Sequence, residues 1–177
     1  MTGAGWRGAV ALLAAVAALA AVNYSIAAKE RLLAHGRVVY LELAPVDPRS
    51  LMQGDYMQLN YRIADEMSRH LPVLGPELVP GDGRVVVTLD PRSVASFARL
   101  APTAGGGPAL AENEAYLRYR VRAGRLKFAS DAFFFQEGTA GAYETARYGR
   151  YRVADDGELL LASLHDEGLD KLPLTHQ

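Results

Sequence analysis

The side chains that most often carry out catalysis are present in this sequence, but they are scattered. The four histidines share no spacing typical of metal ligands; they are His35, His70, His165 and His176. The absence of cysteine excludes disulfides, thiolate metal sites and a cysteine nucleophile. Neither a glycine-rich phosphate loop nor a serine-nucleophile motif is found. The sequence therefore assigns no catalytic residue, no metal site and no cofactor.

Two carboxylates, Asp55 and Glu137, are the residues around which an enzyme site could be assembled. With a histidine brought near by the fold, they would suit the acid–base chemistry of a hydrolase-like enzyme. This alternative requires that the two carboxylates converge in a cleft. A third alternative is a small-ligand binding domain that uses tyrosines as an aromatic lining, which requires a cavity of a few hundred Å³.

Three arginines alternate with apolar residues in the segment 114–122. Arg118, Arg120 and Arg122 would therefore stack three guanidinium groups on one face of one strand. One interpretation is a solvated face whose charge is balanced by acidic neighbours on adjacent strands. The other is a docking face for an acidic partner or for lipid headgroups.

A run of three phenylalanines at 133–135 is the second feature that could bind a partner. Aromatic side chains on both faces of a strand are typical of a central, doubly packed strand. Alternatively, Phe134 is an exposed anchor, and we include it with Gln136 and Glu137 among the candidate interaction residues.

The N-terminal part of the chain reads as a membrane anchor. Residues 8–28 contain no charge, and as a helix they would extend about 30 Å, the hydrocarbon thickness of a bilayer. A cleaved secretory signal is the rival interpretation. We expect a short tail at 1–7, the anchor at 8–28, a juxtamembrane helical extension at 29–36 and a single β-rich domain at 37–177.

The rest of the chain reads as strands joined by turns. A strand is predicted over 37–43, a short helix from Ile63 to Leu71 and a long loop over 72–83. Three hairpins are predicted, at 84–100, 114–128 and 148–164. About eight strands, nearly all antiparallel, predict a β-rich α+β domain that forms a sandwich or a partly closed barrel, with one or two short helices.

The segment GDYMQLNY, residues 54–61, lies about a third of the way along the chain. The alternation of its residues places Leu59 and Tyr61 on one face and Tyr56 on the other. Gly54 permits a tight turn, and Asp55 can accept backbone hydrogen bonds where the strand begins. These features predict a structural joint rather than a catalytic loop.

The same segment fits a family signature at every fixed position: Gly54, Asp55, Tyr56, Leu59 and Tyr61. Together with LELAPVDPRSLMQ, LRYRVR and FFFQEG, it makes the chain resemble the GDYXXLXY family of bacterial membrane-anchored proteins. The resemblance implies an uncleaved anchor. It implies no catalytic residues, because the family's biochemical role is unassigned.

We therefore expect a non-enzymatic accessory or interaction module in the cell envelope. It would sit in the inner (cytoplasmic) membrane as a single-pass protein with its domain facing outside or the periplasm, because only a short segment precedes the span. The expected partners are the bilayer, through residues 8–28, and a multi-spanning membrane protein. The net charge of −1, from 19 basic and 20 acidic residues, does not indicate nucleic-acid binding.

Overall fold

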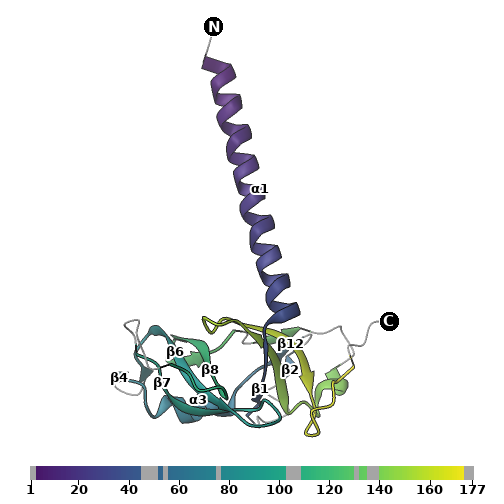
Figure 1. Cartoon of the computed structure of the whole chain (residues 1–177). Helices are drawn as coiled ribbons and strands as arrows, with labels where there is room; N and C mark the ends of the chain where they lie inside the picture. Colours follow the sequence, from purple (N-terminus) through teal and green to yellow (C-terminus); the bar gives the residue numbers. More distant parts are fainter. Residues whose placement is uncertain are drawn as a thin grey trace.

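A computed structural model describes residues 3–44, 52–53, 56–74, 77–102, 109–129, 132–134 and 140–173. It shows a β-rich domain from which one long helix projects (Figure 1). Gly54, Asp55, Gln136 and Glu137 lie outside the described residues, so the predictions made for them remain predictions.

The projecting helix is α1 (Gly3–His35), and it runs through the expected anchor without a break. Its large apolar side chains from Trp6 to Ile26 are each at least 48% exposed. The span Trp6–His35 is long and apolar enough to cross a membrane. The helix ends at His35, just before Gly36, whose amide donates to the carbonyl oxygen of Leu32 at 2.8 Å.

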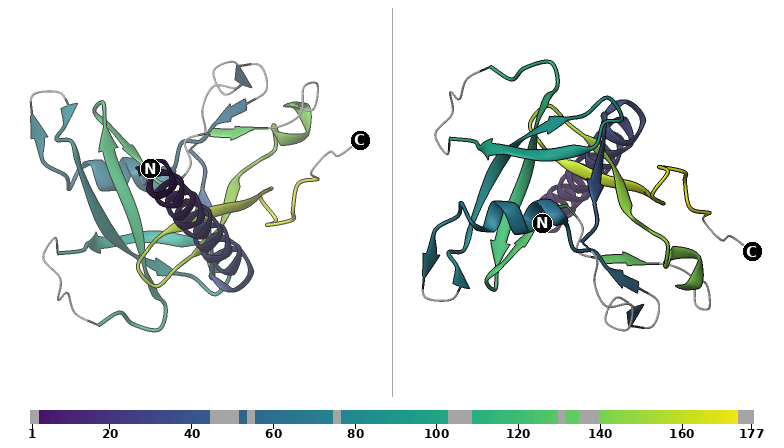
Figure 2. Two further views of the ribbon diagram at one scale, coloured as in Figure 1. Left: turned by 90° about the horizontal axis from the view of Figure 1, so that it is seen from above. Right: turned by 90° about the horizontal axis from the view of Figure 1, so that it is seen from below.

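Two larger antiparallel sheets form most of the domain. The first has the strand order β1-β11-β12, with β1 (Arg37–Glu42), β11 (Tyr148–Val153) and β12 (Leu159–His165). The second has the order β7-β6-β8-β9, with β6 (Gly81–Leu89), β7 (Ala95–Leu100), β8 (Glu114–Arg122) and β9 (Arg125–Lys127). Figure 2 shows these sheets beneath α1, the teal strands on one side and the yellow-green strands on the other.

Smaller elements complete the domain. A three-stranded sheet has the order β10-β3-β2, and β4 pairs with β5. The remaining bounds are β2 (Met52–Gln53), β3 (Tyr56–Gln58), β4 (Val73–Leu74), β5 (Glu77–Leu78), β10 (Ala132–Phe134), the helix α3 (Arg62–Ser68) and the 3-10 helix η1 (Ala140–Tyr143). The predicted short helix is thus confirmed, although it ends at Ser68.

The three predicted hairpins are confirmed as β6–β7, β8–β9 and β11–β12, and local chemistry explains two of their turns. After β6, the Asp90 carboxylate accepts hydrogen bonds from the amides of Arg92 and Val94, both at 2.8 Å. Between β8 and β9, Ala123 and Gly124 both have positive φ, 51° and 69°. Two successive positive φ values match the twist of a tight hairpin.

The prediction of a long loop over 72–83 is wrong. This part of the chain contains the β4–β5 hairpin, and β6 begins at Gly81 rather than at Arg84. Gly81, Asp82 and Gly83 pair with Val121, Arg120 and Tyr119 of β8. A Cβ at position 83 would lie 2.6 Å from Cζ of Tyr119, so this glycine permits the close approach of a ring rather than a turn.

Contacts between the sheets curl them into a half-barrel, which confirms the predicted partly closed barrel. Tyr40 of β1 bridges to Val94 beside β7, and Leu43 bridges to Tyr61. The Arg118 amide of β8 donates to the carbonyl oxygen of Gly157 at 2.8 Å, which joins β8 to the β11–β12 turn. One core fills the interior, and its fully buried members include Val39, Leu41, Val85, Val87, Leu117, Phe128, Tyr151 and Leu164.

Candidate functional site

Three residues of the GDYMQLNY segment lie in the core. Leu59 and Tyr61 are buried, as is Met57 before them. The Tyr61 hydroxyl is hydrogen-bonded to the hydroxyl of Tyr151, and its ring meets the edge of Phe128 with 5.4 Å between the ring centroids. The backbone of Tyr56 pairs with Gln53 on one side and Phe134 on the other. Tyr61 therefore joins the segment between β3 and α3 to β11 inside the core.

The arginines of β8 lie on one exposed face, opposite the buried Ala115, Leu117 and Val121. Arg118 makes an ion pair with Asp156 at 2.6 Å. Arg122 makes one with Asp82 at 2.7 Å. Arg120 is exposed and has no ion pair within the part of the chain that the structure describes. Carboxylates thus compensate the charges of Arg118 and Arg122, whereas no ion pair compensates the charge of Arg120 among the described residues.

A recess of about 550 Å³ opens beside this face. Its lining combines three arginines, two carboxylates and one ring; the residues are Asp82, Gly83, Arg84, Arg118, Tyr119, Arg120, Glu158 and Leu159. Partial burial raises the pKa of the Tyr119 hydroxyl above its ordinary value, so this hydroxyl stays protonated at neutral pH. The Arg84 guanidinium lies 4.8 Å above the ring centroid of Tyr116. We call this feature the arginine recess.

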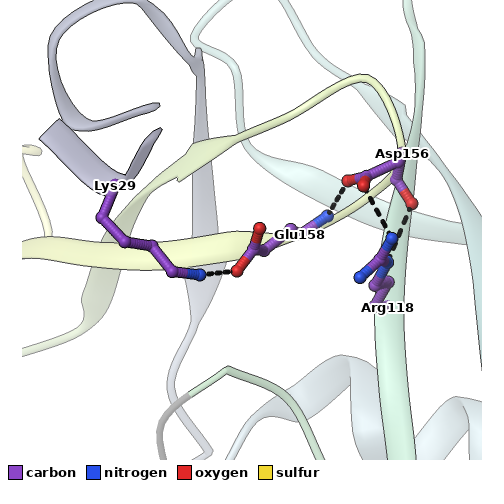
Figure 3. Close-up of polar contacts among 4 residues, drawn as sticks. All are labelled: Lys29, Arg118, Asp156 and Glu158. Atoms are coloured by element: carbon purple, nitrogen blue, oxygen red, sulfur yellow. Dashed lines mark hydrogen bonds and ion pairs between the residues drawn. The ribbon is translucent and has the colours of Figure 1, made fainter. Parts of the chain in front are cut away.

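The arginine recess is tied to the base of α1 by a chain of polar contacts. Lys29 of α1 makes an ion pair with Glu158, whose amide donates to the Asp156 carboxylate at 2.9 Å, and Asp156 in turn holds Arg118 (Figure 3). The Arg152 guanidinium also donates to the carbonyl oxygen of Gly36 at 2.9 Å. The helix and the domain are therefore joined at two points: at Lys29, in the last turns of α1, and at Gly36, directly after the helix ends.

The aromatic run has a different environment from the central strand that three consecutive phenylalanines favour. β10 lies at the end of the order β10-β3-β2, Phe133 is partly buried, and Phe134 is 75% exposed. The doubly packed strand is therefore not observed over 132–134. Phe134 is exposed on the surface, as the interaction hypothesis requires.

β12 also contains a buried serine–histidine pair that the sequence did not predict. His165 Nδ1 lies 2.8 Å from the carbonyl oxygen of Leu169, and its Nε2 lies 2.9 Å from Oγ of Ser163. A carbonyl only accepts, so Nδ1 donates and, in the neutral ring, Nε2 accepts from the Ser163 hydroxyl. Both side chains are buried, and the pair fixes the turn after β12 rather than facing a substrate. The only sequence signal was their spacing of two on an otherwise apolar strand.

The hypothesis of an enzyme site around Asp55 and Glu137 remains a prediction, because both residues lie outside the described residues. Across the described ranges, no three histidine, aspartate or glutamate side chains are grouped so that they could hold a metal ion.

These features define a class of protein: a β-rich half-barrel carried on one helix that is long and apolar enough to span a membrane. The family model described as GDYXXLXY protein matches residues 18–164, and the chain belongs to this family. The match begins inside α1 and ends within β12. Among curated proteins and solved structures, nothing matches the chain significantly. The family carries no assigned activity.

Proposed function

We propose that this protein is a single-span membrane protein whose β-rich domain works at the bilayer surface as a non-enzymatic accessory or interaction module. Its helix α1 would cross the inner membrane of a bacterial cell, and the domain would face the periplasm or the outside. The partner would be a multi-spanning membrane protein.

The observation that carries this proposal is the environment of α1. A helix that packs in a soluble core buries one face, whereas the large apolar side chains of α1 from Trp6 to Ile26 are exposed all around. Exposure of this much apolar surface to water is unfavourable, and a bilayer would cover it. The family match that begins at residue 18 supports a helix that stays with the domain rather than one that is removed.

The base of the helix supports a role close to the membrane surface. Contacts from Lys29 to Glu158 and from Arg152 to Gly36 hold the domain against the end of α1 instead of leaving it on a flexible linker. A domain mounted in this way presents a fixed face to the membrane and to a protein embedded beside it. Phe134 offers an exposed aromatic side chain for contact with such a partner.

The test is membrane retention together with partner recovery. The intact chain should remain in membranes washed with alkaline carbonate, and mild detergent should co-purify one integral membrane protein in constant ratio with it. Release by the wash would contradict the anchor, and recovery of the chain alone after cross-linking in intact membranes would contradict the accessory role.

A further inference from the structure

The arginine recess lies at the level of the bilayer surface if α1 spans the membrane as proposed above, and the inference below rests on that function. Lys29 is the first charged residue after the uncharged stretch 8–28, so it marks the level of the lipid headgroups. Glu158 binds Lys29 and also lines the recess. In Figure 1, the tip of the β11–β12 hairpin lies on the side of the domain from which α1 emerges.

The charges in and around the recess leave two cations uncompensated. Each lining carboxylate already has a cationic partner. Asp82 lies opposite Arg120 in the strand register, but its ion pair is with Arg122, and Glu158 makes one with Lys29. Arg118 is paired with Asp156. Arg84 and Arg120 make no ion pair with a carboxylate among the described residues. The recess therefore has a net positive charge.

The strand register places two of these cations directly opposite each other. Arg84 of β6 faces Arg118 of β8, so their side chains leave the sheet on the same side. Like charges at such positions repel, and Asp156 offsets only one of them. An anionic group between the guanidinium groups of Arg84 and Arg118, on the face of the sheet, would relieve this repulsion and accept charge-assisted hydrogen bonds from them.

We propose that the arginine recess binds the phosphate of an anionic lipid headgroup, with Arg84 and Arg120 as its main ligands. The headgroup would enter from the membrane surface beside α1, where its acyl chains remain in the bilayer. Binding there would add a lipid-dependent contact to the domain at the point where Lys29 and Glu158 already fix it to the helix.

The test compares two lipids with the same acyl chains on the intact protein in neutral detergent. Native mass spectrometry would measure binding of phosphatidylglycerol and of phosphatidylcholine to the wild type. The variant Arg84→Gln/Arg120→Gln removes the two uncompensated charges. Arg69→Gln/Arg92→Gln is the matched control, because it removes two exposed arginines that do not line the recess.

We expect the wild type to bind phosphatidylglycerol about tenfold more tightly than phosphatidylcholine. The recess variant should lose that preference, and the control should stay within about twofold of the wild type. Equal binding of both lipids by the wild type would overturn the proposal, and so would an equal loss in both variants.

A competition arm separates lipid from other phosphate. Soluble glycerol phosphate at the same concentration should not displace phosphatidylglycerol, since it lacks acyl chains in the apolar phase. Displacement would show a site for a soluble phosphate and would overturn the assignment to lipid. A chain that resists the alkaline wash but binds both lipids equally would contradict this inference alone, whereas release by the wash would contradict the proposed function.

Discussion

At the scale of single residues, the last tyrosine of the GDYMQLNY segment is held by a hydroxyl pair in the core. Tyr61 and Tyr151 are both buried and hydrogen-bonded to each other. Their rings also meet edge to face, with centroids 6.1 Å apart. A phenylalanine at position 61 would keep the ring packing and remove this hydrogen bond, so the hydroxyl is the feature to test.

We expect Tyr61→Phe to lower the free energy of unfolding by about 1–2 kcal/mol, because a buried polar group loses a partner. Tyr151→Phe should have a similar effect, and the double variant should fall short of the sum by ~1 kcal/mol. Urea unfolding of the intact chain in neutral detergent, followed by the near-ultraviolet circular dichroism of the tyrosines, measures this. Strict additivity would show that the hydroxyls do not interact.

A second residue-scale feature is the Glu114 carboxylate at the start of β8. It makes a two-point ion pair with Arg99 and accepts a hydrogen bond from the Ala111 amide at 3.0 Å. The hydrogen bond from Arg99, followed by that from Ala111, lowers the pKa of Glu114 from 4.5 to about 2. The ionised form is therefore stabilised in the folded protein.

This lowered pKa predicts a pH dependence of stability. Because the folded pKa is below the unfolded one, the contribution of Glu114 is complete above pH 4.5 and is lost as the pH falls toward about 2. The difference in unfolding free energy between the wild type and Glu114→Gln should thus shrink across this window. Urea titrations at several pH values measure it, with Glu112→Gln as an exposed control. A constant difference down to pH 2 would contradict the ion pair.

At the scale of elements, the pairing of β6 with β8 depends on Gly83, a residue of the segment that was predicted to be a loop. A Cβ at Gly83 would lie 2.6 Å from Cζ of Tyr119, whereas a Cβ at Gly81 would meet nothing within 4 Å. Both glycines belong to the same strand, so they form a matched pair.

Gly83→Ala should destabilise the domain by about 1–3 kcal/mol, because the Tyr119 ring must move to make room. Gly81→Ala should change stability by less than about 0.5 kcal/mol. Thermal or urea unfolding of the two variants measures the change in stability that each substitution causes. Equal effects of both substitutions would contradict the close packing of Tyr119 on β6.

The sequence was sufficient for the elements whose signals are local. Turn residues such as Asp90 and Ala123-Gly124 indicate where hairpins form, and alternation predicted the exposed arginines of β8. The two-residue strands β2, β4 and β5 were missed, because so few residues show no periodicity. The ion-pair partners of Arg118 and Arg122 could not be predicted from the sequence either. Asp156 and Asp82 approach these arginines only because of how the strands and turns pack in the folded domain.

At the scale of the whole molecule, the part of the chain that the structure describes combines an exposed apolar helix with a half-barrel mounted on its end. The contacts from Lys29 to Glu158 and from Arg152 to Gly36 mean that the helix direction sets the orientation of the domain. If α1 crosses a bilayer, the arginine recess is then held at its surface. The membrane position of α1 is therefore the central claim.

Protease treatment of intact spheroplasts that carry the chain with an epitope tag after Gln177 tests this claim most directly. The readout is the length of the chain that remains in alkaline-washed membranes. We predict that the washed membranes hold full-length chain before treatment, and that external protease removes the tag while leaving an N-terminal fragment in the membrane. A chain released by the wash, or a tag protected until the spheroplasts are lysed, would contradict the account.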